Sequence, residues 1–139
     1  SCDSLAKITV GNNVTDIGGY AFNNCDSLTN ITLPDSLVTS GERAFYDCDS
    51  LKSVTIPKSV RAINSTAFAG CDNLVSITVD ENNTNYSSDS RGVLFDKDKT
   101  VLKQYPVGSD ATSYTVPDSV TKIEEAYDLA VENYNNMIK

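Results

Sequence analysis

The chain has 139 residues, a net charge of −8 and no histidine. Its length suits one domain, and its acidic balance argues against binding to nucleic acid or to an anionic membrane, which both need clustered Lys and Arg. The lack of histidine excludes Ser-His-Asp and Cys-His nucleophilic systems and every histidine-containing metal site. No apolar run approaches the roughly 20 residues of a membrane span.

Four cysteines divide the first part of the chain into units of equal length. Cys2, Cys25, Cys48 and Cys71 follow one another at a fixed step of 23 residues, and each opens a Cys-Asp-x-Leu motif. Such a step is typical of stacked units that cannot bury their apolar faces alone. The sequence therefore predicts repeats over residues 2–79. Because the chain begins inside a repeat, without a signal peptide, we expect it to be a piece of a longer protein.

Each unit contains a short strand, which the third unit illustrates. Val54, Thr55 and Ile56 alternate inward and outward, as strand residues do, and Pro57 stops the strand. The Ala67-Phe68 pair that follows predicts a short helical turn. Equivalent residues of successive units should stack in columns that form the core: Leu5, Leu28, Leu51 and Leu74; Ile8, Ile31, Val54 and Ile77; Phe22, Phe45 and Phe68.

One position breaks the apolar pattern. Ser40 falls in the column of Ile17, Ile63 and Ile123. Either the second unit is displaced so that Val38 fills the gap, or a hydroxyl faces the core and needs a hydrogen-bond partner. We expect the displacement, because the glycine after Ser40 permits an unusual backbone.

The repeat pattern resembles that of a known family. Ala44-Phe45, Cys48, Leu51, Val54, Ile56 and Pro57 fit the signature A-F-x-x-C-x-x-L-x-x-[IV]-x-[ILV]-P, which is similar to the BspA-type leucine-rich repeats of bacterial surface proteins. The resemblance covers roughly residues 1–123. It implies an α/β fold, namely a right-handed leucine-rich-repeat solenoid with a parallel sheet on one face. It also implies that the chain comes from a surface protein associated with adhesion.

The fourth unit departs from the step after Val79. Residues 80–113 form an insert, or island, in which two apolar runs, 93–95 and 101–105, flank a polar turn and predict a β-hairpin. This insert also resembles an island of the same family, which usually carries Asp where this chain has Arg91.

The last segment, 114–139, is predicted to hold a partial repeat and a helix. Tyr114-Thr115-Val116-Pro117 echoes the strand and proline of the third unit. From Glu124 to Ile138, apolar residues recur at steps of three and four, which predicts a helix that caps the stack. We expect all 139 residues to form a single leucine-rich-repeat domain.

The cysteines and the aspartates that follow them form two further columns. Adjacent strands lie about 4.8 Å apart, so four collinear sulfurs cannot surround one tetrahedral zinc ion. We expect buried thiols, and disulfides between neighbouring repeats are the alternative. The aspartates, Asp3, Asp26, Asp49 and Asp72, should accept hydrogen bonds from backbone amides in turns, and calcium binding between them is the alternative.

The predicted function is a non-catalytic interaction or adhesion module of a bacterial cell-surface or secreted protein, with a structural spacer as the alternative. We expect no catalytic residue, metal or cofactor, no membrane insertion, a monomer, and an extracellular protein or host-surface ligand as partner. Specific interfaces need roughly 800 Å² per partner, so the strand face should act together with the island. The candidate contact residues are Lys7, Asn30, Ser53 and Ser76, then Thr9, Thr32, Thr55 and Thr78, and in and beside the island Tyr86, Arg91, Tyr105 and Tyr114. The threonine column could instead order water, or could be ordinary strand surface, and the tyrosines could instead cover the hairpin's own core.

Overall fold

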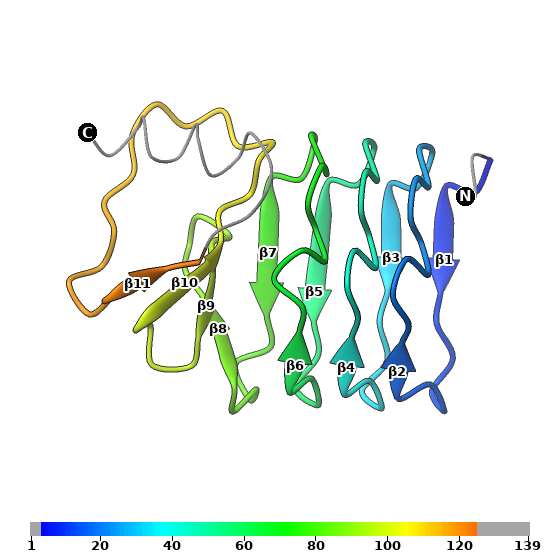
Figure 1. Ribbon diagram of the computed structural model, residues 1–139, viewed down its shortest axis with the longest axis horizontal. Coiled ribbons are helices and arrows are strands. Elements are labelled where there is room, and N and C mark those ends of the chain that lie inside the picture. Colours follow the sequence, from blue (N-terminus) through cyan, green and yellow to red (C-terminus); the bar gives the residue numbers. More distant parts are fainter. Residues whose placement is uncertain (1–3, 125–139) are drawn as a thin grey trace.

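The computed structural model describes residues 4–124, and in this range the chain forms a stack of short strands (Figure 1). The first strand of each turn is β1 (Lys7–Thr9), β3 (Asn30–Thr32), β5 (Ser53–Ile56) and β7 (Ser76–Val79). β1 pairs with β3 and β5 pairs with β7, both in parallel and at the step of 23 residues. The strand period and the repeat length predicted from the sequence are therefore confirmed.

A second column of strands lies beside the first and was not predicted. β2 (Asp16–Ile17), β4 (Thr39–Ser40) and β6 (Ala62–Ile63) form a continuous three-stranded parallel sheet. Asp16 pairs with Thr39, and Thr39 pairs with Ala62. Each strand has only two residues, which is too short to show period two in the sequence.

The three predicted apolar columns form the core. Leu28, Leu51 and Leu74 are fully buried, and Phe45 and Phe68 are buried as well. The rings of Phe22, Phe45 and Phe68 stack with centroid separations of 5.5 and 5.3 Å. The columns become exposed at the first turn, where Leu5 is 50% exposed, because no described turn covers it.

The segments around the Ala-Phe pairs are turns, and the predicted helical turns are absent from residues 4–124. Hydrogen bonds of the i→i+3 type, such as Tyr46 N–H to Arg43 O at 3.1 Å, close these segments. Each turn ends on a residue with positive φ immediately before a cysteine, namely Asn24, Asp47 and Gly70. This left-handed conformation suits Asn, Asp and Gly and reverses the chain into the next repeat.

No helix occurs among residues 4–124, so the α part of the predicted α/β class has no support in the described chain. The predicted capping helix, about Glu124 to Ile138, lies outside the described residues except for Glu124. Likewise, residues 4–124 contain no helix long and apolar enough to cross a membrane.

The predicted hairpin in the island is confirmed. β9 (Leu94–Asp96) and β10 (Val101–Gln104) pair in antiparallel. β8 (Tyr86–Ser88) adds an unpredicted third strand, antiparallel to β9, and β11 (Lys122–Ile123) pairs in parallel with β10. Residues 114–116 do not form the strand that their likeness to the third unit predicts.

The repeat step of 23 residues continues into the island, past the break that was predicted after Val79. Asn83 lies 23 residues after Val60, and Tyr86 lies 23 residues after Ile63. Both side chains are buried, as are Val60 and Ile17 in their columns. The fourth turn therefore keeps the columns and changes only the residue types that fill them.

Asn83 links the third turn to the fourth. Its amide nitrogen donates to Pro57 O at 2.8 Å and to Val60 O at 3.0 Å, and its amide oxygen accepts from the backbone N–H groups of Asn85 and Tyr86. All four capacities of a buried amide group are satisfied, as burial requires.

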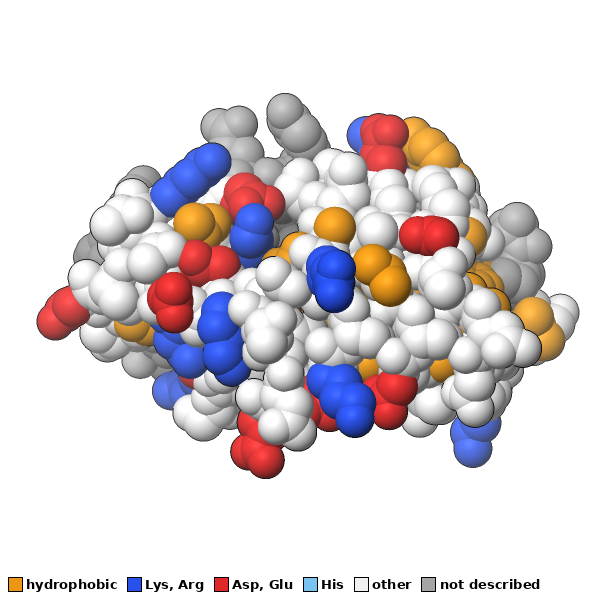
Figure 2. All heavy atoms as spheres, turned by 90° about the horizontal axis from the view of Figure 1, so that it is seen from below, with side chains coloured by type: hydrophobic (Ala, Val, Ile, Leu, Met, Phe, Trp, Pro, Cys, Tyr) orange, Lys and Arg blue, Asp and Glu red, His pale blue; other side chains and the backbone are white. Residues whose placement is uncertain are grey.

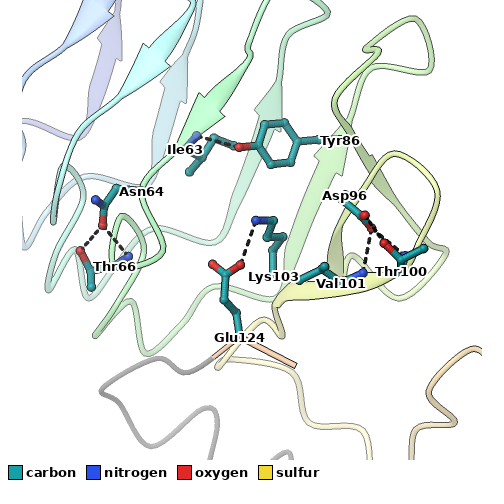
Figure 3. Close-up of polar contacts among 9 residues, drawn as sticks. All are labelled: Ile63, Asn64, Thr66, Tyr86, Asp96, Thr100, Val101, Lys103 and Glu124. Carbon is teal, nitrogen blue, oxygen red and sulfur yellow. Dashed lines mark hydrogen bonds and ion pairs between the residues drawn. The ribbon is translucent and has the colours of Figure 1, made fainter. Parts of the chain in front are cut away.

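The island also closes the strand edges left by the last repeat. The Tyr86 hydroxyl accepts from Ile63 N–H at 2.8 Å (Figure 3). The backbone N–H of Ile77 donates to Gly92 O, and that of Val79 donates to Ser88 Oγ, both at 2.9 Å. Covering edges in this way prevents another chain from pairing with them.

Gly92 is required at this closure. Its φ is +73°, and an added Cβ would lie 2.6 Å from the Ser76 Cα of β7. Only a glycine combines this backbone conformation with so close an approach between two segments of backbone.

The expectation for Ser40 is wrong. Ser40 stays in register between Ile17 and Ile63, without displacement, and is 8% exposed. Its hydroxyl is buried and has no hydrogen-bond partner among the described residues. The ladder of β2, β4 and β6 fixes the register, so the serine occupies an apolar position at a cost in stability.

Candidate functional site

The outward residues of β1, β3, β5 and β7 form the strand face, in two columns. In one column, Lys7, Asn30 and Ser53 are exposed and Ser76 is half-buried; in the other, Thr9, Thr32, Thr55 and Thr78 are all exposed. The in-register pairing holds each column in line. The strand face is therefore a regular surface of hydroxyl and amide groups with one lysine.

The strand face is interrupted between β3 and β5. These neighbouring strands share no ladder, whereas β1–β3 and β5–β7 are paired. A groove of about 290 Å³ lies there. Its walls include the outward side chains of Asn30, Thr32, Ser53 and Thr55, four of the predicted contact residues.

Pro57 explains part of this interruption. One turn later, Asp80 N–H donates to Ile56 O at 3.0 Å. The equivalent donor to Leu33 O would be the nitrogen of Pro57, which carries no hydrogen. One ladder bond is therefore impossible between the second and third turns.

The carboxylates of Asp35 and Asp80 border the groove. Neither residue was predicted to make contacts. Asp80 is held in a turn by the backbone N–H of Asn82, which donates to its Oδ1 at 2.9 Å. The described residues that line the groove include no lysine or arginine. The groove therefore favours neutral or cationic groups over anions.

The island tyrosines contribute little exposed surface. Tyr86 and Tyr105 are each 6% exposed, and Tyr105 packs in a cluster with Phe95 and Leu102. The ring of Tyr114 meets that of Tyr105 edge-on at 5.3 Å and is half-buried. For Tyr86 and Tyr105 the structural alternative holds, and these rings are not available as contact surface.

Arg91 is exposed, in a turn that Asp89 organises. Asp89 Oδ1 accepts from the backbone N–H groups of Arg91 and Val93 at 3.0 and 3.1 Å, and its other oxygen accepts from the Tyr114 hydroxyl. The turn therefore forms around Asp89 without an aspartate at position 91. Of the island residues predicted to make contacts, only Arg91 and part of Tyr114 reach the surface.

The polar groups elsewhere in the island stabilise the fold (Figure 3). Burial raises the pKa of Asp96, but hydrogen bonds from Thr100 and Val101 outweigh it and hold the pKa below its usual value. Lys103 and Glu124 form an ion pair at 2.8 Å beside a cavity of about 10 Å³. That volume holds about one water molecule, so it offers no room for a substrate.

The cysteine column is mixed. Cys48 and Cys71 are buried thiols that donate to Phe22 O and Phe45 O at 3.1 and 3.0 Å, as expected. Cys25 is disulfide-bonded, contrary to the expectation of thiols throughout. Cys2 lies outside the described residues.

The aspartate column differs from its prediction. The side chains of Asp26, Asp49 and Asp72 are exposed, and among residues 4–124 no backbone amide donates to them; instead, leucine N–H groups donate to the cysteine carbonyls. Burial, then the charges of Asp72 and Asp26, raise the pKa of Asp49. No group of three or more acidic or cysteine side chains in residues 4–124 is placed to hold a metal ion.

Charge is spread thinly over one face of the molecule. Figure 2 shows a face on which uncharged polar atoms predominate and charged side chains of both signs are scattered. No large basic patch gathers there, so this face offers nothing that would attract a polyanion.

Comparison with known proteins identifies the family of this chain. A family model described as the BspA type leucine-rich repeat region matches residues 1–91, in six copies. No curated protein sequence matches the chain.

Three solved structures are similar to the chain. The pneumococcal vaccine antigen PcpA is 32% identical, with a TM-score of 0.82 over 87% of this chain and 30% of its own. A leucine-rich cell surface protein of Faecalibacterium prausnitzii is 31% identical, with a TM-score of 0.76 over 86% of this chain and 31% of its own. A leucine-rich repeat protein of Bacteroides capillosus is 36% identical, with a TM-score of 0.50 over 54% of each chain. The chain thus spans about a third of the length of the first two.

Proposed function

Because this chain belongs to the BspA-type leucine-rich repeat family, we propose that it is a non-catalytic adhesion module of a bacterial cell-surface or secreted protein. The strand face is its contact surface. The observation that carries the proposal is the groove between β3 and β5, which places polar side chains of two turns around one hollow of about 290 Å³.

The similar structures support a surface location. One is described as a vaccine antigen and another as a cell surface protein. In this chain, the hydroxyl and amide groups of the strand face point outward, and the apolar residues that alternate with them in β3, β5 and β7 are buried. Such a surface forms hydrogen bonds with a partner without exposing apolar area.

The burial of two island tyrosines favours the structural spacer as a second candidate. Tyr, Trp and Arg dominate the hot spots of protein interfaces. The strand face has none of them, and Tyr86 and Tyr105 are buried. A spacer requires a stiff stack and a polar surface, which this chain also provides.

Binding of the purified chain to host cells separates the two candidates. The contact variant changes Asn30, Thr32, Ser53 and Thr55 to alanine; the control variant carries Glu42→Gln and Ser65→Ala, at exposed positions in the turns after β4 and β6. We expect the contact variant to lose cell binding while its melting temperature and that of the control stay unchanged. If neither the chain nor either variant binds any cell surface tested, the adhesion proposal is wrong and the spacer remains.

A further inference from the structure

The gap between β3 and β5 leaves backbone groups available in the middle of a solenoid. No backbone hydrogen bond joins residues 30–33 to residues 53–56. In a parallel pair, each strand turns alternate N–H and C=O groups toward its neighbour. The sides of the groove therefore carry both donors and acceptors, which a ligand could satisfy in place of the missing ladder.

The side chains around the groove add groups of the same two kinds. The hydroxyls of Thr32, Ser53 and Thr55 donate and accept, the Asn30 amide does both, and Asp35 accepts. A ligand complementary to this lining must itself donate and accept at closely spaced atoms. Sugar hydroxyls meet that requirement, since every hydroxyl group has one donor and two acceptor positions.

The charge around the groove and the volume of the groove narrow the class of ligand further. The chain carries a net charge of −8, and Asp35 and Asp80 border the groove without a lysine or arginine in its described lining. Acidic sugars are therefore disfavoured. The volume of about 290 Å³ lies at the lower end of the range for small-molecule sites, about 300 Å³.

We propose that the groove between β3 and β5 binds one neutral sugar unit, through hydrogen bonds to both strands and to the two carboxylates. This inference rests on the proposed function, because the groove lies in the strand face. Among the described residues, no aromatic side chain lines the groove to stack on a sugar ring. The affinity for a single unit is consequently weak, in the range of about 1 mM, and several units on one glycan would raise it.

The direct test is a titration of the isotopically labelled chain, followed by amide NMR. The probes are the methyl glycosides of glucose, galactose, mannose and N-acetylglucosamine, with sialic acid as the anionic control. We expect at least one neutral probe to shift the amides of β3 and β5 and to leave those of β1 and β2 unchanged, and sialic acid to shift neither. Multivalent glycans carrying the same sugar then distinguish a glycan end from a free sugar by their higher affinity.

Two variants of matched chemistry locate the site. Thr55→Val removes a hydroxyl from the groove, and Thr78→Val removes the hydroxyl of the same column one turn later, outside the groove. Both residues are exposed, so both variants should fold with unchanged melting temperatures. We expect Thr55→Val to weaken binding about tenfold, the effect of one hydrogen bond of about 1.4 kcal/mol, and Thr78→Val to leave it unchanged.

The outcomes separate this inference from the proposed function. If no neutral sugar shifts the amides of β3 and β5 up to about 50 mM, far above the expected dissociation constant, the sugar site is wrong. Equal losses in both variants would also overturn it. If cell binding through the strand face persists in either case, the adhesion proposal stands; if cell binding is absent too, both fail.

Discussion

The repeats and the island bury the same columns by different chemistry. In the second and third turns the column positions hold apolar residues except at Ser40, and the backbone of β6 satisfies the edge of β4. In the fourth turn, Asn83 and Tyr86 occupy the columns of Val60 and Ile63, and side chains satisfy the edge. The step of 23 residues therefore continues where polar side chains replace the strand ladder of the repeats.

The hydrogen bond to a backbone carbonyl of the preceding turn comes from a serine in the repeats and from an asparagine in the island. Ser36 Oγ donates to Val14 O at 2.7 Å, and Ser59 Oγ donates to Leu37 O at 2.6 Å, each to the preceding turn. In the fourth turn the bond to Val60 O comes from the Asn83 amide. The repeats rely on many equivalent contacts, whereas the island concentrates several contacts on single residues, so single changes should cost more in the island.

The largest expected effect is at Asn83. Asn83→Leu restores an apolar residue to the column but leaves four backbone groups without their partner. At about 1–3 kcal/mol for each buried group that stays unsatisfied, we expect chemical denaturation to show a loss of roughly 3–5 kcal/mol. Val60→Leu, one turn earlier, is the matched control, and its extra methylene should cost about 1–3 kcal/mol. Equal losses would mean that column volume, not hydrogen bonding, sets the cost.

Substitution of one glycine in the island and one in the repeats gives the next test of the difference between the two regions. In the island, a Cβ at Gly92 would meet the Ser76 backbone at 2.6 Å; in the repeats, a Cβ at Gly70 would meet the Asp47 carboxylate at 1.9 Å. A side chain can rotate away and a backbone cannot. We expect Gly92→Ala to cost about 3 kcal/mol and Gly70→Ala about 1–2 kcal/mol, mainly from its positive φ.

The double variant Asp47→Gly, Gly70→Ala separates clash from strain. Removing the carboxylate should recover the part of the Gly70→Ala loss that comes from the clash. The reference is Asp47→Gly alone, because glycine also relieves the positive φ of Asp47. If Gly70→Ala costs as much in that background as in the original chain, the clash contributes nothing and only the backbone conformation matters.

Ser40 is the place where the repeats themselves are imperfect. Ser40→Ala removes a buried hydroxyl that has no partner among the described residues, so we expect a gain of about 1 kcal/mol. Ser36→Ala removes a hydroxyl that is bonded to Val14 O and should instead lose about 1 kcal/mol. Denaturant midpoints of both variants give the comparison, and a loss at Ser40 would show that its hydroxyl is satisfied in solution.

The smallest effect concerns charge, and its sign differs between the two regions. The pKa of Asp49 in the repeats is raised by burial and then by Asp72 and Asp26, while that of Asp96 in the island is lowered. A raised pKa makes the ionised form of Asp49 unfavourable in the fold, so the stability of the protein increases as the pH falls through the folded pKa of Asp49. A lowered pKa means that the ionised form of Asp96 stabilises the fold, so the protein loses this stability as the pH falls through the folded pKa of Asp96.

At pH 7 we therefore expect Asp49→Asn to raise stability by a few tenths of a kcal/mol, because Asp49 is exposed, and Asp96→Asn to reduce it. Melting curves at low and high salt check this. The gain at Asp49 should shrink in salt, which screens the repulsion in the column. A gain that is independent of salt would contradict the repulsion.

Much of the fold could be predicted from the sequence because the repeat carries the information many times over. The cysteine step fixed the register, and the alternation of Val54, Thr55 and Ile56 identified strands that the structure confirms. The second column of strands was missed because two-residue strands have no visible period. Ser40 was misjudged because the backbone ladder holds a register that a single side chain cannot change.

The candidate site was only partly predictable. The exposure of Thr32 and Thr55 follows from strand alternation, but the groove depends on a ladder missing between two strands, and the only sequence signal for it is the missing N–H of Pro57. Tyr86 and Tyr105 were candidates for a contact surface because hot spots favour tyrosine, with burial in the hairpin's own core as the alternative. They are buried because the fourth turn uses large side chains to close the stack.

The missing ladder between β3 and β5 also has a mechanical consequence. Hydrogen bonds between turns run along the stack, so they carry any tensile load applied to its two ends. At this one level, the β4–β6 pair and the adjoining turns, such as Phe45 N–H to Ala67 O, carry that load without help from the strand face. Under fluid shear the stack should bend open at the groove, about a hinge formed by β4 and β6, before any other turn separates. Its compliance is therefore localised at the groove.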